Sequence, residues 1–285
     1  MYKCEQCSDR RALFIIGEEY AEAALCDACN IMCMKCSGRG FHVTSRGEYE
    51  YVVDCECKDI EKRIRLFNAA KIPALYADKL YEVIQTSPSY KVHQSQQAMQ
   101  HKAIEWARAY QKGQTGFLIE GTFGTGKTMM LCQALSILTL ELGVSCRYVD
   151  FSFVLQDIKQ KIANKENGAD SVTSTLRAVS VLAVDELGKI RGTDWELSEL
   201  DLLISRRYQS SQTTLFATNF GEEELRTRIG GKLASRLKEK CEFLSIRGND
   251  FRQQALVSKK NSKNVVKPSS LLLPSLQGPD EAKSE

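Results

Sequence analysis

The stretch from residue 117 to residue 128 constrains this chain more than any other. An apolar run at 117–119 leads into a glycine-rich loop, and a helical pattern follows over 129–142. A strand, such a loop and a helix in this order form a polyphosphate-binding site, because inward N–H groups and the helix N-terminus attract anions. The nucleotide-binding residues predicted from this motif are Gly121, Thr122, Phe123, Gly124, Thr125, Gly126, Lys127 and Thr128.

Two side chains of the loop and a second acidic motif predict the chemistry. Lys127 is expected to reach the β- and γ-phosphates, and the Thr128 hydroxyl to bind Mg²⁺. The apolar run 181–184 reads as a strand buried on both faces of a parallel sheet, and it ends in Asp185 and Glu186. We expect Asp185 to complete the Mg²⁺ site and Glu186 to orient and deprotonate an attacking water.

A further predicted strand, over 213–219, ends in Asn219. Ligands bind at the carboxyl ends of strands in open α/β sheets, so Asn219 is expected to sense the γ-phosphate or to position water. Asp185 and Glu186 together with Asn219 suit attack by water better than phosphoryl transfer to a metabolite. A last strand is predicted over 243–246.

The eleven cysteines are concentrated at the start of the chain, with eight in the first 57 residues. They form four close pairs, which predict two Cys₄ zinc sites. The predicted ligands are Cys4, Cys7, Cys26 and Cys29 in the first site, and Cys33, Cys36, Cys55 and Cys57 in the second. An interleaved pairing, His42 as a substitute ligand and a redox dithiol are alternatives. The sites could stabilise folding or dock a partner.

Composition and patterning set the domain organisation. The 285 residues are 43% hydrophobic and 26% charged, as in globular proteins, and a net charge of +3 is too small to argue for nucleic acid. Without a bilayer-length apolar run or a signal peptide, we expect a cytoplasmic protein with no membrane partner. The predicted regions are 1–58, zinc-binding; 59–112, a helical connector; 113–258, the nucleotide-binding core; and 259–285, a disordered tail. Within the connector, the polar stretch 87–100 reads as a surface loop before a helix at 97–111.

These motifs together resemble the AAA+ ATPases of the DnaC/DnaI helicase-loader and IstB transposition-helper group, over about residues 60–255. The segments that carry the resemblance are 121–128, 184–188, 204–208, 217–219 and 233–237. The second cysteine set is similar to the zinc-binding amino-terminal region of many such loaders. The first set, Cys4 to Cys29, is extra relative to that pattern.

The resemblance implies an α/β fold of the AAA+ P-loop NTPase type, a parallel sheet flanked by helices, preceded by a small Cys-rich zinc-binding domain. It makes Asn219 sensor 1, Arg236 an arginine finger that reaches a neighbouring subunit, and Arg252 a residue near the nucleotide. The helices after the second core strand correspond to an insertion that contacts single-stranded DNA. Candidate phosphate contacts there are Lys159, Lys161 and Arg177.

The implied function is ATP-dependent loading or remodelling of a replicative DNA helicase on single-stranded DNA. ATP, Mg²⁺ and two zinc ions would be bound, and a homo-oligomer would hydrolyse ATP at its subunit interfaces. One alternative is a transposition helper of the same fold, whose partner is a transposase. Another is a nucleotide-gated adaptor in which the zinc modules bind a protein or DNA and hydrolysis is incidental.

Overall fold

The structure is a computed structural model of the 285-residue chain. It describes residues 4, 6–7, 11–28, 36–37, 39–47, 49–80, 94–164, 169–189, 193–248 and 250–251. All of them belong to one compact unit, Met1–Phe251. The predicted site residues Cys29, Cys33 and Arg252 and the tail 259–285 lie outside the described residues.

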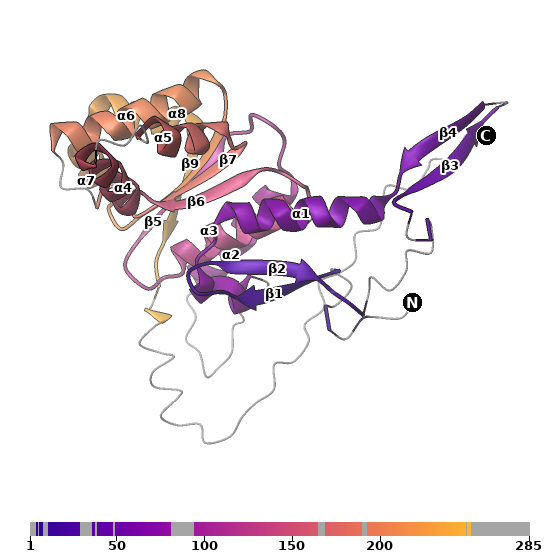
Figure 1. The fold of residues 1–285 in the computed structure, drawn as a ribbon. Helices are drawn as coiled ribbons and strands as arrows, with labels where there is room; N and C mark the ends of the chain where they lie inside the picture. Colours follow the sequence, from indigo (N-terminus) through magenta and orange to yellow (C-terminus); the bar gives the residue numbers. More distant parts are fainter. Residues whose placement is uncertain are drawn as a thin grey trace, which may run out of the picture. The chain divides into compact units, whose positions relative to one another are not determined.

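A five-stranded sheet forms the centre of this unit (Figure 1). Its strands are β5 (Gly116–Gly121), β6 (Cys146–Asp150), β7 (Val181–Asp185), β8 (Thr213–Thr218) and β9 (Cys241–Ile246). They lie in the order β6-β7-β8-β5-β9, and every neighbouring pair is parallel. The predicted parallel sheet flanked by helices is therefore confirmed, with β9 beginning two residues earlier than expected.

Helices cover both faces of the sheet, because alternate residues of each buried strand point to opposite sides. On one face, Phe117 and Ile119 pack with α1 (Glu56–Ala70), α2 (Gln94–Arg108) and α3 (Lys127–Leu140). On the other face, Leu118 packs within a second hydrophobic cluster. The helices of that second face are α4 (Phe151–Ala163), α5 (Ala169–Ala178), α6 (Asp194–Gln209), α7 (Glu222–Ile229) and α8 (Gly231–Lys240).

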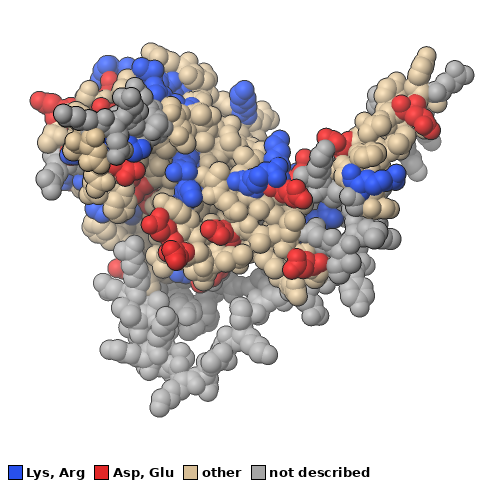
Figure 2. All heavy atoms as spheres, viewed as in Figure 1, with Lys and Arg blue, Asp and Glu red and all other residues tan. Residues whose placement is uncertain are grey.

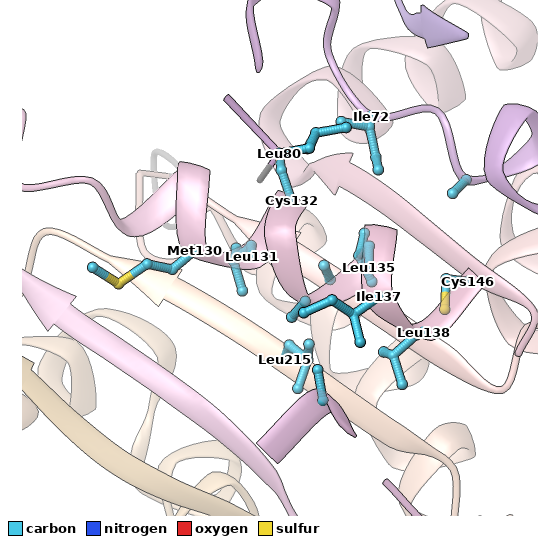
Figure 3. Packing of buried hydrophobic residues seen from close by; sticks show 14 of the residues in the cluster. Ile72, Leu80, Met130, Leu131, Cys132, Leu135, Ile137, Leu138, Cys146 and Leu215 are labelled. Carbon is cyan, nitrogen blue, oxygen red and sulfur yellow. The ribbon is translucent and has the colours of Figure 1, made fainter. Parts of the chain in front are cut away.

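Helix α3 is buried nearly all round, as a helix between the sheet and two further helices must be. Met130 to Leu140 are all buried, including the polar Gln133. Ile72 and Leu80, which precede α2 in the chain, join the hydrophobic cluster around it (Figure 3). The side chain of Gln133 is satisfied on both sides, accepting from Gln100 Nε2 at 2.9 Å and donating to the Lys79 carbonyl at 3.0 Å.

The prediction that residues 87–100 form a surface loop is wrong from Gln94 onward. Helix α2 begins there and ends at Arg108, three residues earlier than predicted. Gln96 and Gln100 are fully buried, one turn apart on the face that packs against α3. Their amides have specific partners inside the fold, so a polar composition here marks a buried contact face and not a solvated loop.

A buried arginine, Arg207, joins α6 to α5 and to the start of strand β8. Arg207 of α6 is 1% exposed and donates to Thr214 Oγ1 at 3.0 Å. Its guanidinium also donates to the carbonyls of Leu176, Val179 and Thr213, at 2.8, 3.0 and 2.6 Å. Burial lowers the pKa of Arg207 to about 10, so the side chain stays charged at neutral pH. Within the segment 204–208, which carries part of the family resemblance, Arg207 therefore has a structural role.

Both cysteine sets enclose an antiparallel hairpin. The first hairpin is β1 (Ala12–Ile16) with β2 (Ala21–Leu25), and the second is β3 (Phe41–Arg46) with β4 (Tyr49–Asp54). The first hairpin buries alanines against α1, and the Asn68 side chain bonds both the N–H and the carbonyl of Ala23, at 2.7 and 3.1 Å. A short 3₁₀ helix, η1 (Ala74–Lys79), continues this packing.

The second hairpin, in contrast, exposes its apolar side chains. Tyr49 is 71% exposed, Val52 70% and Val43 52%. Two strands alone bury little apolar surface, so such a hairpin gains little stability from packing by itself. Among the described helices, none combines the length and apolarity needed to cross a membrane.

The close approach of β5 to β8 gives a stability prediction. A Cβ at Gly116 would lie 2.0 Å from the Thr214 carbonyl oxygen, so Gly116→Ala must push the two strands apart. We expect a loss of about 1–3 kcal/mol in the free energy of unfolding, measured by urea denaturation. Gly231→Ala, at the start of α8, is the control, because its Cβ would approach Arg226 Nε no closer than 4.0 Å, an ordinary van der Waals contact. Equal stability of the two variants would contradict the packing described here.

Candidate functional site

The loop between β5 and α3 has the backbone geometry of an anion site. Gly124 and Gly126 have φ angles of 73° and 95°, in the left-handed region that glycine favours. Gly126 is the N-cap of α3 and supplies no capping side chain. The first N–H groups of α3 therefore lack a side-chain cap and can bind phosphate.

Lys127 is held inside this loop. The side chain is 7% exposed, and Nζ donates to the carbonyls of Gly121 and Thr122, each at 2.8 Å. A third bond reaches Asn219 Oδ1 at 2.6 Å, at the end of β8. The ammonium group is thus oriented toward the carboxyl ends of the strands.

Asp185, at the carboxyl end of β7, is the centre of a second group. It is 4% exposed, and its Oδ2 accepts from Thr128 Oγ1 at 2.7 Å and from Tyr148 OH at 2.8 Å. Its Oδ1 accepts from the Glu186 N–H at 2.8 Å. Thr128 and Asp185 thus place two hard oxygen donors side by side, which is the ligand type that Mg²⁺ prefers.

Glu186 completes the cluster in an unusual conformation. Its φ of 54° is in the left-handed region, where a non-glycine residue costs about 1–3 kcal/mol. Asn219 Nδ2 donates to Glu186 Oε2 at 2.9 Å, and Lys189 Nζ lies 3.9 Å from Oε1. Burial and the neighbouring Asp185 raise the pKa of Glu186. A raised carboxyl pKa brings a general base closer to the pH at which it must accept a proton.

The chain beyond β9 approaches the phosphate loop. The Phe251 N–H donates to the Gly124 carbonyl at 3.0 Å, and a Cβ on Gly124 would lie 1.8 Å from Asp250 Oδ1. Gly124 is therefore required by this close approach as well as by its φ angle. A pocket of about 380 Å³ beside the loop is lined by Glu120, Gly121, Thr122, Asn219, Gly221, Ser245, Ile246, Arg247 and Gly248.

The Arg236 side chain is held by helix α6. Its guanidinium, on α8, donates to Asp201 Oδ1 at 2.6 Å and to the Ser205 hydroxyl, both on α6. The side chain is 25% exposed. Within one subunit, these contacts bind Arg236 to α6 and not to the cluster around Lys127 and Glu186.

The first cysteine set is brought together by the hairpin β1–β2. The thiols of Cys4, Cys7 and Cys26 lie within 4.8 Å of one another, and the Cys4 and Cys26 sulfurs are 3.8 Å apart. Tetrahedral zinc with Zn–S bonds of about 2.3 Å separates its sulfurs by about 3.8 Å, so the three thiols fit such a site.

The second cysteine set is described in part. Cys36 and Cys55 are both buried, and Gly40 bonds each end of this hairpin, its N–H to Cys36 Sγ at 3.3 Å and its carbonyl to the Cys55 N–H at 2.8 Å. Cys57 falls in the first turn of α1, which starts at Glu56 instead of the predicted residue 59. His42 Nδ1 is buried without a hydrogen-bond partner among the described residues, which keeps it a candidate ligand.

Two of the three candidate DNA contacts are engaged within the chain. Lys159 Nζ bonds Glu196 Oε1 at 3.0 Å and lies 4.9 Å from the centre of the Trp195 ring. The Arg177 guanidinium donates to the Thr173 carbonyl at 3.1 Å. Acidic and basic side chains are interspersed over the face shown in Figure 2, as the small net charge suggests.

Tyr148 is the site residue that sequence reasoning missed. The phenol reaches Asp185 only through the parallel pairing of β6 with β7. Burial, followed by the charge of Asp185, raises the pKa of Tyr148 well above its ordinary value. No spacing in the sequence marks this contact.

The chain is similar in sequence to several known proteins. The family model of the IstB-like ATP binding protein matches residues 42–259. The uncharacterized protein YqaM of Bacillus subtilis (strain 168) is 27% identical over 210 residues, 70% of this chain and 64% of that protein. The chain thus spans slightly under two thirds of the length of YqaM. The replicative helicase loader DnaC of Escherichia coli (strain K12) is 23% identical over 178 residues, 62% of this chain and 70% of DnaC.

A solved structure supports the fold. The crystal structure of the DnaC helicase loader superposes with a TM-score of 0.51 at 21% sequence identity, covering 64% of this chain and 99% of that one. At this identity the likeness establishes the AAA+ fold. The family match extends over most of the chain and contains both the phosphate loop and the cluster at Asp185. The chain therefore belongs to the IstB-like ATP-binding protein family, and it binds ATP on an AAA+ fold.

Proposed function

We propose that this protein is an ATP-hydrolysing loader or remodeller of a replicative DNA helicase, acting as a homo-oligomer on single-stranded DNA. The observation that carries the hydrolytic part is the bonded group of Lys127, Asp185, Glu186 and Asn219 at the carboxyl ends of the strands. The partner is suggested by relatedness to proteins named replicative helicase loaders.

Each residue of the group has a distinct task in this proposal. Lys127 exchanges its carbonyl partners for the β- and γ-phosphate oxygens. Thr128 and Asp185 would hold Mg²⁺, which would supply positive charge to neutralise the phosphates. Glu186 accepts a proton from the attacking water. Asn219 is bonded to both Lys127 and Glu186, so it keeps the general base aligned with the phosphate. Because the pKa of Glu186 is raised, turnover should increase with pH as this carboxyl deprotonates.

Arg236 supports a site shared between subunits. The arginine is anchored by Asp201 and Ser205 on α6, and a quarter of its side chain remains exposed. A guanidinium so held can stabilise charge on the γ-phosphate of an adjacent subunit. Hydrolysis would then depend on assembly of the subunits.

A subunit-mixing experiment tests the shared site. Lys127→Ala should lose binding of a fluorescent ATP analogue, whereas Glu186→Gln and Arg236→Ala should bind it and release phosphate at least tenfold more slowly than wild type. Mixing these last two variants rebuilds complete sites, in which one subunit supplies Glu186 and the other Arg236. Turnover of the mixture should therefore exceed the sum of the two separate rates. Normal hydrolysis by Arg236→Ala would refute the shared site.

We propose that the exposed hairpin β3–β4 docks the helicase. Its apolar side chains, among them Tyr49 and Val52, are far more exposed than a core residue. Exposed apolar patches of this kind mark protein-binding surfaces. The family name favours a second candidate, a transposition helper with a transposase as partner.

Co-purification separates these candidates. Tagged protein isolated from its host with ATP present should retain a replicative helicase, and the double variant Tyr49→Ser, Val52→Ser should retain several-fold less of it. Binding of the ATP analogue should be unchanged in the variant, because the hairpin, residues 41–54, is remote in sequence from the phosphate loop. Recovery of a transposase without helicase would support the transposition helper, and stoichiometric binding of another partner without stimulated turnover would support the adaptor.

We also propose that the chain binds two structural zinc ions. The three clustered thiols supply all but one of the ligands of the first site, and Cys29 would supply the fourth. Elemental analysis should give about two zinc ions per chain for wild type and about one for Cys26→Ser. Cys241→Ala, which changes a buried cysteine of β9, should keep both ions. Purified wild-type protein that holds no zinc would contradict both sites.

A further inference from the structure

The carboxylate of Asp185 is held from three directions. Thr128 Oγ1 and Tyr148 OH both donate to Oδ2, at 2.7 and 2.8 Å, and the Glu186 N–H donates to Oδ1. Thr128 follows the phosphate loop and Glu186 is the next residue in the chain. Tyr148, in contrast, comes from a different strand, β6.

The pairing of β6 with β7 places the Tyr148 phenol beside Asp185. In the parallel pairing, Tyr148 lies opposite Ala183, and Asp185 is the next residue along β7 on the same face. The ring packs against the hydrophobic cluster that surrounds α3. A tyrosine is a neutral donor at neutral pH, so it can bond a carboxylate without competing with a cation for charge.

We propose that Tyr148 is a positioning residue that orients Asp185 for binding Mg²⁺ with the nucleotide. The inference deepens the magnesium site of the proposed function. The Thr128 hydroxyl would have to serve both the metal ion and Oδ2, whereas the Tyr148 hydroxyl would serve Oδ2. The Glu186 N–H fixes the other oxygen, so the plane of the carboxylate stays set between two donors.

The test is the magnesium dependence of nucleotide binding. Tyr148→Phe removes one hydroxyl and keeps the ring in the core. With a fluorescent ATP analogue, the Mg²⁺ concentration for half-maximal enhancement of binding should rise about tenfold, as expected for a lost hydrogen bond to a charged group. Binding of the analogue in EDTA should stay within about twofold of wild type, because the phosphate loop is untouched.

Tyr208→Phe is the matched control. The Tyr208 hydroxyl also donates to a carboxylate, Glu239 Oε2, and at the same 2.8 Å, but between α6 and α8. This variant should reproduce the wild-type Mg²⁺ titration. Thermal unfolding with the analogue, in Mg²⁺ and in EDTA, gives a second measurement: Tyr148→Phe should lose most of the extra rise in melting temperature that Mg²⁺ produces.

The Mg²⁺ titration can contradict this inference without contradicting the proposed function. An unchanged Mg²⁺ titration for Tyr148→Phe would overturn the inference, as would equal shifts in Tyr148→Phe and Tyr208→Phe. A wild-type protein whose nucleotide binding ignores Mg²⁺ would overturn it too. The titration needs neither turnover nor a helicase, so failure of hydrolysis or loading leaves this result standing on its own.

Discussion

The burial of α3 on all sides is the constraint on which the rest of the structure depends. The sheet lies against one side of this helix and α1 and α2 against the others, so that its residues from Met130 onward are buried. A helix packed in this way cannot roll or slide without opening the core. Its N-terminus, where the phosphate loop ends, is therefore fixed, and Lys127 is held by the carbonyls of that loop.

The cluster at the carboxyl ends of the strands follows from that placement. Lys127 comes from the loop after β5, Asp185 from β7 and Asn219 from the end of β8, so parallel strand order brings together residues that are distant in the chain. Buried polar groups require partners, and here they provide them for one another. Asn219 links Lys127 to Glu186, while Tyr148 and Thr128 hold Asp185.

The cysteine-rich start of the chain shares the same core. The hairpin β1–β2 packs on α1, and Ala21 N–H bonds the Ile72 carbonyl at 2.7 Å. The residues that follow reach α3, where Gln133 bonds the Lys79 carbonyl. The first cysteine cluster is thus joined to the nucleotide-binding helix by continuous packing, whereas β3–β4 keeps its apolar side chains exposed.

The sequence by itself determined the features that depend on local order and on residue type. Glycine spacing before Lys127, apolar strands that end in Asp185 and Asn219, and paired cysteines identify the parallel fold, the ATP site and the thiols near Cys4, because each signal is contiguous. Only the tertiary structure decided which side chains meet across strands. It buried Gln96 and Gln100 in a stretch that composition assigns to solvent, bonded Arg236 to α6, and brought Tyr148 to Asp185. These contacts depend on strand register and helix packing, which no short segment of the chain encodes.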